Sequence, residues 1–546
     1  MEHQHQHHRG QWGSNFGFLM ATVGAAVGLG NIWAFPYKMG ASGGFPFLLV
    51  YVILAALIGF PIMLSELAIG RKVGRSVIVS YQRLGGGVGT FIGWLAMLSP
   101  FLILSFYTVL GGYCMEYVAL NLGELLGLSQ LSHLSGAESF HNMLTDQPMA
   151  LLFTFLFIAI CFLIIRGGIK DGIERFNKVG MPALFVMLVI VIIRALTLPG
   201  AIDGLKFMFA PNFTMFKEDF LGVLSAAGGQ MFFSLSLAMG ITVTYGSYLS
   251  KQENLVKNSA LIIISDTLVA ILAGMAVLPA AFALGGSGAE LAGPKLLFIT
   301  LQDVFNAMGT AGPLFGVLFY LLVSLAAITS AIALTEVMVT FFLDHAALKG
   351  HKPNRSRIVG LVCLAVMAVS TLVAVDGLGS NGLWVPFHQT GRNLAASWLD
   401  FMDFISEGVA MPLGALIMTL LVGWKIGPGT IRDEVMERDN PFSPRLYRFY
   451  IFAIRVIAPI GMAFILYGPT GPVLHRDRGL KQDKQCRVSE VFRYTAFCCL
   501  FILNRPDIPP PGSAARRRSG AGIGEGAARH QPGPAPAPGP GGPDGP

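Results

Sequence analysis

Long stretches of apolar residues alternate with short polar connections along most of this chain. Many of them approach the ~20 residues that an α-helix needs to cross the hydrocarbon core of a bilayer. The pattern predicts an all-α polytopic membrane protein with about eleven transmembrane helices. These cover residues 15–37, 46–69, 91–122, 150–165, 180–198, 221–248, 255–284, 313–342, 358–375, 401–424 and 449–467.

Composition supports this class, because 53% of the 546 residues are hydrophobic, only 13% are charged and the mean hydropathy is +0.62. A soluble chain needs more polar residues to cover its core. The sequence contains no P-loop, no metal-ligand spacing and no nucleophile paired with a base. We therefore expect a protein that is not an enzyme.

The formal charge of +7 is distributed unevenly between the connections. Lys and Arg gather in alternate loops, at 71–83, 166–178, 251–257, 349–357 and 425–448, whereas the opposite loops hold only Lys38, Lys206, Lys217, Lys295 and Arg392. By the positive-inside rule, the first set and the N-terminus are cytoplasmic. The positive charge is thus a topology signal, and we expect no nucleic-acid partner.

The two ends of the chain differ from its body. Residues 1–12 read as a cytoplasmic N-terminal segment without a cleavable signal peptide, and its histidines are interpreted as solvated rather than metal-binding. Residues 13–468 form one expected membrane domain, which holds the eleven predicted helices. Residues 469–546 are an atypical tail rich in Pro, Gly, Ala and Arg, predicted to be disordered.

The first apolar stretch contains the segment GAAVGLGNIWAFP at residues 24–36, where glycines, a proline and Asn31 interrupt the helical pattern. Non-helical backbone is tolerated at membrane depth only where it lines a protein cavity or water. Freed carbonyl groups can bind a cation, and freed N–H groups can bind an anion. The segment therefore predicts a binding site made by the backbone.

A second interrupted segment, GGQMFFSLSLAMG at residues 228–240, lies in the sixth apolar stretch. Interruptions in the first and sixth segments indicate an inverted-repeat transporter with a site near the bilayer midplane. The alternative is that these glycines only allow close packing of helices.

The stretch WGSNFGFLMATVGAAVGLGNIWAFPY, followed by GGFPFLLVYVILAALIGFPIMLSELAIGR, closely resembles the bacterial branch of the neurotransmitter:sodium symporter family. The resemblance covers roughly residues 9–467. It implies a leucine-transporter-type inverted repeat with broken first and sixth helices. It also implies a multi-pass protein of the bacterial inner membrane that binds sodium and a small-molecule amino acid.

The resemblance implies two sodium sites. The ligands of the first would be the Ala26 carbonyl, Asn31, Ser234 and Asp266, and those of the second would be Gly24, Val27, Ala326, Thr329 and Ser330. Asp266 stands where the leucine transporter has asparagine, which makes the first site more anionic. Taken from the residues alone, an acid inside a membrane helix is a functional candidate, with a structural ion pair as the alternative.

The resemblance also implies an amino-acid site. Its substrate-binding residues would be Ala26, Gly28, Leu29, Gly30, Ile103, Tyr107, Phe233, Ser234, Ser236, Met239 and Leu334. Backbone N–H groups of the first interruption and the Tyr107 hydroxyl would hold the carboxylate. The side-chain pocket would be apolar, so we expect a neutral, hydrophobic or aromatic substrate.

Four gate residues follow from the same resemblance: Arg9, Trp12 and Asp344 at the cytoplasmic side, and Asp403 at the outer side. The family's outer arginine is replaced by Ala34, and we leave open whether Lys38 substitutes for it. Residues 172–182 match a Gly-x9-Pro pattern at which the fifth helix can unwind in relatives. An ordinary helix start with a proline in its first turn is the alternative.

The sequence thus predicts sodium-coupled amino-acid symport by alternating access, with one or two sodium ions. Chloride is doubtful, because Ala270 fits neither pattern of the family and Asp266 or Glu66 can supply negative charge. The alternatives are a proton-coupled or sodium-independent transporter of the same fold, or a non-transporting homologue. The oligomeric state stays open.

Overall fold

All eleven apolar stretches are helical in the computed structural model, which describes residues 10–128, 131–284, 295–386, 396–436 and 442–466. Within these residues, nine helices are long and apolar enough to cross a membrane, and a pair bent by 48° makes a tenth span. The remaining expected span, 221–248, is divided between two shorter helices. None of the described residues forms a β-strand.

The helices of the first five spans follow the chain in order. They are α1 (Asn15–Ala26), η1 (Gly30–Ala34), α2 (Phe35–Ala41), α3 (Phe45–Leu54), η2 (Ala55–Gly59), α4 (Phe60–Val73), α5 (Val77–Leu125), α7 (Gln147–Ile165), η4 (Ile169–Glu174) and α8 (Arg175–Leu196).

The later spans comprise α11 (Phe220–Ser234), α12 (Ile241–Gly246), α13 (Leu255–Ala283), α15 (Gly312–Leu348), α16 (Arg355–Asp376), α17 (Trp398–Asp403), η8 (Phe404–Ala410), α18 (Met411–Leu420), η9 (Leu421–Ile426), α20 (Pro444–Phe452) and η10 (Ala453–Ile457). Short connecting helices are η3 (Leu131–His133), α6 (Gly136–Thr145), α9 (Ala201–Phe209), α10 (Thr214–Glu218), η6 (Leu296–Thr300), α14 (Leu301–Ala307), η7 (Gly309–Ala311) and α19 (Pro428–Met436).

The predicted interruptions are present in the first and sixth spans. The first span breaks between α1 and η1, where Val27 has an extended backbone. The sixth breaks between α11 and α12, where Ser236, Ala238 and Gly240 have positive φ angles of 53°, 59° and 74°. Such angles are costly for residues with a side chain, and they persist only where surrounding contacts hold them.

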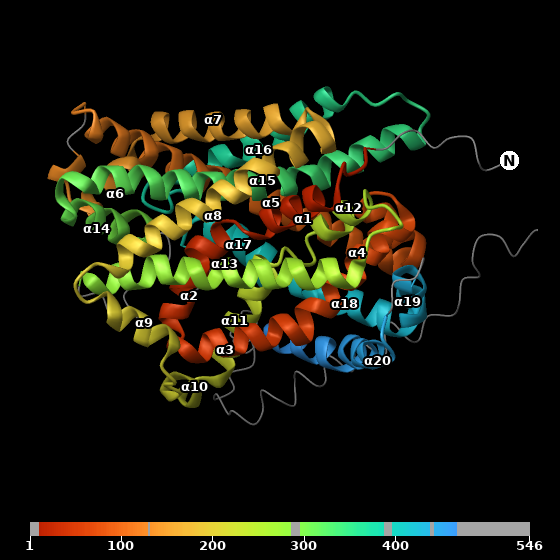
Figure 1. The fold of residues 1–546 in the computed structure, drawn as a ribbon. Helices are drawn as coiled ribbons and strands as arrows, with labels where there is room; N and C mark the ends of the chain where they lie inside the picture. The colour runs from red at the N-terminus through yellow and green to blue at the C-terminus, as the bar shows by residue number, and fades with distance from the viewer. Residues whose placement is uncertain (1–9, 129–130, 285–294, 387–395, 437–441, 467–546) are drawn as a thin grey trace, which may run out of the picture. The chain divides into compact units, whose positions relative to one another are not determined.

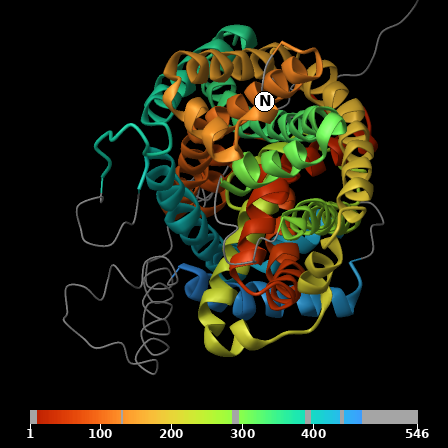
Figure 2. The same ribbon diagram turned by 90° about the vertical axis from the view of Figure 1, so that its left-hand side faces the viewer.

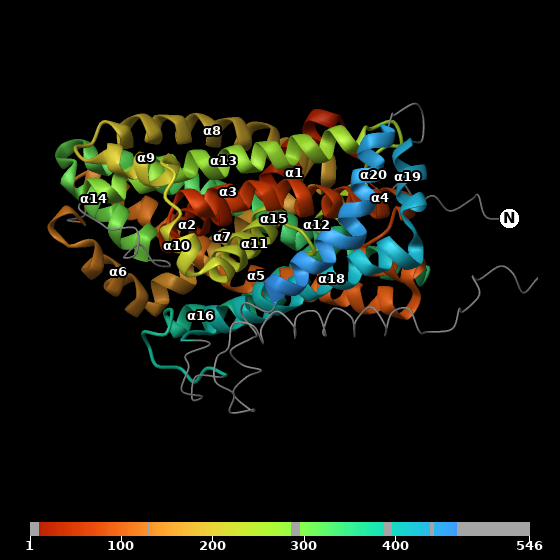
Figure 3. The same ribbon diagram turned by 90° about the horizontal axis from the view of Figure 1, so that it is seen from below.

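The broken spans lie inside the helix bundle. Figure 2 shows the red N-terminal helices enclosed by later ones, and α1 packs against α8, α13 and α15. In the most apolar 18-residue stretch of the α15 span, 78% is buried, whereas the share in the corresponding stretch of α7 is 33%. Helix α15 is therefore internal, and α7 faces outward. Figures 1 and 3 show α6 and α14 at the end of the bundle opposite α19.

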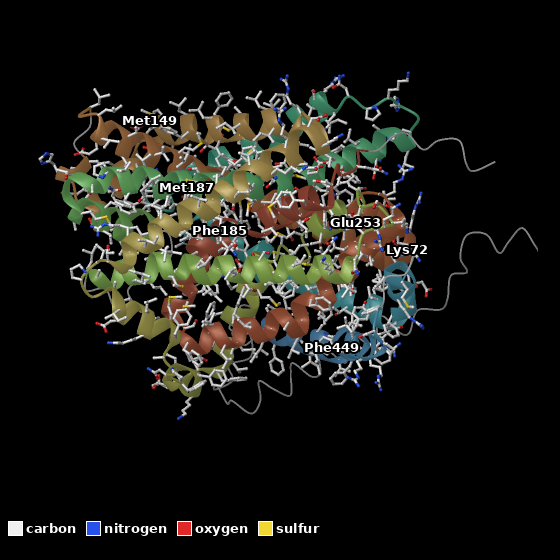
Figure 4. All side chains as sticks on the ribbon, viewed as in Figure 1. Lys72, Met149, Phe185, Met187, Glu253 and Phe449 are labelled. Carbon is white, nitrogen blue, oxygen red and sulfur yellow. The ribbon has the colours of Figure 1, made fainter. Side chains whose placement is uncertain are left out.

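The sides of the helix bundle carry exposed apolar side chains. Lys72 and Glu253 lie at one end of the helices, and Met149 lies at the other (Figure 4). Outward-facing positions between them are apolar; Phe185, for example, is 43% exposed. This arrangement suits a lipid-facing belt between two polar surfaces.

Two helices are longer than their apolar stretches indicated. The third span was expected at 91–122, but α5 begins at Val77 and turns at Gly86, whose φ is 62° and ψ is −135°. The fifth was expected at 180–198, but helical structure begins at Ile169. Hydropathy marks only the part of a helix that lies in lipid, so helical ends in the polar zone escape it.

We expect Gly70→Ala to destabilise the protein by about 1–3 kcal/mol, the usual range for overpacking. A Cβ atom at Gly70 would collide with the Val243 carbonyl and lie 3.0 Å from the Ser247 amide nitrogen, where α4 packs on α12. Thermal unfolding of the detergent-solubilised protein measures the change. Gly87→Ala is the matched control, because no atom lies within 4 Å of its added Cβ. Equal melting temperatures for the two variants would contradict this close packing.

Candidate functional site

The first interruption exposes two backbone N–H groups that are bound by side chains. The Leu29 amide donates to the Tyr107 hydroxyl oxygen at 2.9 Å, and the Gly28 amide donates to Asn31 Oδ1 at 3.3 Å. Gly28 must lack a side chain, because a Cβ atom there would collide with the hydroxyls of Tyr107 and Ser330. The close approach of α5 and α15 to this backbone therefore requires glycine.

Asp266 on α13 is the centre of a fully buried polar cluster. Asn31 Nδ2 donates to Asp266 Oδ1 at 2.8 Å, and the hydroxyls of Ser234 and Tyr51 donate to Oδ2 at 2.8 and 3.1 Å. All four side chains have 0% exposure. Asp266 thereby joins the two interrupted spans, since Asn31 lies in η1 and Ser234 ends α11. The cluster contains the side chains expected at the first sodium site, and Tyr51 is an additional member.

Glu66 on α4 holds the second interruption. Its carboxylate accepts hydrogen bonds from the Ala238 amide at 3.1 Å and from the hydroxyl of Thr242. The Tyr81 hydroxyl donates to the same carboxylate at 3.4 Å. These bonds satisfy backbone freed by the positive-φ turn, which explains why a buried acid is tolerated here.

A second group of oxygen atoms lies between α1 and α15. The Ser330 hydroxyl is 3.3 Å from the Gly24 carbonyl, 3.1 Å from that of Ala25 and 3.5 Å from that of Val27. One hydroxyl proton serves one acceptor at a time, so the group has more oxygen acceptors than donors. Thr329, the other expected side-chain ligand, donates back to the Ala326 carbonyl at 2.8 Å.

The two interruptions border a narrow cavity of about 20 Å³, room for about one water molecule. Its lining consists of Ala25, Ala26, Gly28, Gly30, Ile103, Tyr107, Phe233, Ser236, Met239, Ile241, Ser330 and Leu334. Nine of the eleven expected substrate residues are in this lining. Of the other two, Leu29 donates to the lining residue Tyr107, and Ser234 follows the lining residue Phe233 in the chain. Ser236 also donates to the Ala25 carbonyl at 3.1 Å.

At the α2 end of the first span, Lys38 pairs with Glu407 on η8, one turn beyond the expected gate residue Asp403. The Lys38 Nζ–Glu407 Oε1 distance is 2.5 Å, and the two side chains are 16% and 12% exposed. Lys38, Asp403 and Glu407 together line another cavity, of about 500 Å³. The pair joins α2 of the broken first span to the tenth span.

At the opposite end, Trp12 packs against Tyr245 of the sixth span. Its Nε1 donates to the Tyr245 carbonyl at 3.1 Å, and its ring packs edge-on against Phe18 and Tyr245. Asp344 accepts from the Ser76 amide at 2.5 Å and lies 3.7 Å from Arg75. Arg9, its expected partner, lies outside the described residues.

Residues 172–182 are helical throughout, with η4 followed by α8. Glu174 in this segment accepts from the Gly13 amide at 2.6 Å and the Ser14 hydroxyl at 3.0 Å, and pairs with Lys178 at 2.7 Å. The fifth span is thus attached to the start of α1.

The sequence reasoning missed some contacts. The sequence analysis predicted Asp403 as the gate residue and did not name Glu407, which lies one turn further along. An acid within an apolar helix is nevertheless a signal of function that could have identified Glu407. Gln230 Nε2 donates to the Gly30 carbonyl at 2.7 Å, an interaction across 200 positions of sequence. No pattern within one helix predicts which carbonyl such a side chain reaches.

Comparison with protein families identifies one match over most of the chain. The model of the "Sodium:neurotransmitter symporter family" matches residues 9–147 and 140–470.

Individual relatives agree with that match. The sodium-dependent transporter YhdH of Bacillus subtilis is 33% identical over 464 residues, which are 84% of this chain and 98% of the relative. The human sodium- and chloride-dependent GABA transporter 2 is 24% identical over 79% of this chain and 75% of its own. Among solved structures, MhsT in complex with L-phenylalanine superposes with a TM-score of 0.74 at 34% identity, covering 84% of this chain and all of that one.

We expect Lys38→Gln to lower the melting temperature more than Glu407→Gln, because loss of the lysine leaves two neighbouring carboxylates, Asp403 and Glu407, uncompensated. The double variant should recover part of the loss, with a coupling of about 0.5–3 kcal/mol between the two sites. A thermal double-mutant cycle on the purified protein measures this coupling.

The exposed pair Lys206–Asp203, with side chains 65% and 62% exposed, provides the matched control cycle. Its coupling should be close to zero, since solvated ion pairs contribute little. If both cycles gave the same small coupling free energy, the Lys38–Glu407 contact between α2 and η8 would not stabilise the protein.

Proposed function

The chain belongs to the sodium:neurotransmitter symporter family, and within it we propose sodium-coupled import of a neutral, hydrophobic or aromatic amino acid by alternating access. The protein is a multi-pass membrane transporter and not an enzyme. The observation that carries the proposal is the buried Asp266 carboxylate, which joins the two interrupted spans through Asn31 and Ser234.

The first sodium ion would bind at this cluster. Asn31, Ser234, Asp266 and the Ala26 carbonyl offer amide, hydroxyl, carboxylate and carbonyl oxygens, which are the ligands that hard cations take. A cation would also compensate the buried charge of Asp266, which is otherwise stabilised by neutral donors alone. Binding there would draw η1, α11 and α13 together.

The second ion would bind between α1 and α15. The Gly24 and Val27 carbonyls already converge on Ser330, and Ala326 and Thr329 supply the remaining proposed ligands. Thr329 can bind a cation through an oxygen lone pair while it keeps its bond to Ala326. This site would join the broken span to the internal helix α15.

The amino acid would bind in the cavity between the two interruptions. Tyr107 accepts from the Leu29 amide, so its own proton stays available to a substrate carboxylate near Gly28 and Gly30. Carbonyls of Ala26 and Phe233 and the Ser236 hydroxyl would receive the amino group.

Selectivity would come from the side-chain end of the cavity. Ile103, Phe233, Met239 and Leu334 are all apolar and offer no partner for a charged substrate side chain. Methionine adapts to varied shapes, which suits several hydrophobic substrates. The L-phenylalanine bound by the similar MhsT is consistent with this class.

Alternating access would close the outer side with Lys38 and Glu407, next to Asp403, and the cytoplasmic side with Trp12 and Asp344. Each sodium ion that moves inward contributes ~2.3 kcal/mol per 100 mV of membrane potential. The proposed orientation places the N-terminus in the cytoplasm of a bacterial cell, with the transporter in its inner membrane. We further propose that Asp266 makes chloride unnecessary.

We expect proteoliposomes containing the protein to accumulate radiolabelled leucine and tryptophan under an inward sodium gradient. An equal potassium gradient, and vesicles without protein, should give only background, because a potassium gradient does not drive a sodium-coupled transporter. Replacement of chloride by gluconate should leave uptake unchanged. Equal uptake with both cations would refute sodium coupling for these substrates and favour the proton-coupled alternative, whereas background uptake with both would favour a non-transporting homologue.

We expect Asp266→Asn to raise the sodium concentration for half-maximal uptake at least about tenfold, or ~1.4 kcal/mol, because a charged ligand becomes neutral. The matched control is Asp376→Asn, another fully buried carboxylate, which lies at the end of α16 and caps the Gly379 and Trp398 amides. Sodium titration of uptake compares the two variants. The same half-maximal concentration in both would remove Asp266 from the proposed ion site.

A further inference from the structure

Asn177 on α8 has a buried amide oxygen that nothing bonds. Its side chain has 0% exposure, and Nδ2 donates to the Ile173 carbonyl at 2.9 Å within the same helix. Because a carbonyl only accepts, this bond fixes which end of the amide is nitrogen. Oδ1 has no hydrogen-bond partner among the described residues.

This oxygen lies against Gly24. A Cβ atom on Gly24 would collide with Asn177 Oδ1 and lie 3.2 Å from the sulfur of Met181. In an α-helix the Cα–Cβ direction tilts toward the N-terminus, whereas the carbonyl points toward the C-terminus. Asn177 therefore approaches Gly24 from its Cβ side, whereas the Gly24 carbonyl faces Ser330. Glu174, one turn before Asn177, bonds Gly13 and Ser14, so this part of α8 and η4 lies toward the N-terminal end of α1.

A buried acceptor without a donor is energetically unfavourable, because the loss of its hydration is not offset by a hydrogen bond. Leucine or methionine at position 177 would avoid this penalty, because neither carries a hydrogen-bond acceptor that must be satisfied. An amide oxygen is also a neutral, hard ligand of the kind that binds sodium or calcium. The unpaired oxygen beside an oxygen-rich group thus points to a cation that is not always present.

We propose that Asn177 Oδ1 is a transfer ligand, the first oxygen that binds the second-site cation when it leaves toward the N-terminal end of α1. The inference rests on the proposed function, which places sodium at Gly24, Val27 and Ser330. The charge distribution predicts that the N-terminal end faces the cytoplasm. Asn177 would then lower the barrier for inward release and contribute little to the bound state.

The adjacent helix explains how this ligand is regulated. The Ile173 carbonyl that orients Asn177 belongs to η4, and Gly168, with a φ of 84°, precedes that segment. While η4 is wound, the amide is held with Oδ1 toward Gly24. Unwinding of η4 would release Nδ2 and let the amide turn with the departing ion. Glu174 in η4 also binds the start of α1, so one segment controls both contacts.

The test compares Asn177→Leu with the native protein in two measurements. Sodium-dependent thermal stabilisation of the full chain reports equilibrium affinity, and leucine uptake into proteoliposomes at saturating sodium reports turnover. We expect the sodium affinity to stay within about threefold, while turnover falls at least about tenfold, or ~1.4 kcal/mol in activation free energy. Asn177→Asp keeps an oxygen at this position and should restore turnover relative to leucine.

Val179→Leu is the matched control, because it alters a 71% exposed side chain on the same helix and should change neither measurement. Native turnover in Asn177→Leu would overturn the inference. A loss of sodium affinity above about tenfold would also overturn it, since Asn177 would then be a ligand of the bound ion. If Asn177→Leu fails to fold, a comparison of Asn177→Asp with Asn177→Ala decides the same point. Absence of sodium dependence in the native protein would instead refute the proposed function.

Discussion

A membrane offers no water to backbone groups that leave a helix, and this constraint organises the whole structure. Each interruption is accompanied by a buried partner from another span. Leu29 is bound by Tyr107, Ala238 by Glu66, and the Gly30 carbonyl by Gln230. The helices that enclose the broken spans are thus also their hydrogen-bond partners, which is why the site lies at the centre of the bundle.

The second requirement is that neighbouring helices approach the first interruption closely, and this approach depends on glycine residues. A Cβ atom on Gly30 would lie 2.7 Å from the ring of Phe233, and one on Gly28 would collide with two hydroxyls. Glycine at these positions lets α5, α11 and α15 reach the first interruption directly. The same residues that weaken the helix therefore make room for the groups that satisfy its backbone.

Three buried charged groups in the described part of the chain hold the broken spans and the helices next to them. Asp266 connects the two interrupted spans, Glu66 fixes the positive-φ turn of the sixth, and the Lys38–Glu407 pair links α2 to η8. A buried carboxylate held only by neutral donors is less favourable than one beside a cation. Events that change the local charge, such as ion binding or entry of water, would therefore bias how these helices pack.

The sequence by itself determined the helical membrane class, the number of spans within the uncertainty of their ends, and the interruptions at residues 24–36 and 228–240. These follow from local composition, because hydropathy and helix-breaking residues act over one or two turns. Resemblance to the family added the candidate residues, most of which the structure brings together around one cavity. Only the tertiary structure decided that Lys38 pairs with Glu407, that Tyr51 joins the Asp266 cluster, and that the Asn177 oxygen lies against Gly24. Such contacts depend on how distant helices are rotated against one another, which side-chain packing across the whole bundle sets and no single segment encodes.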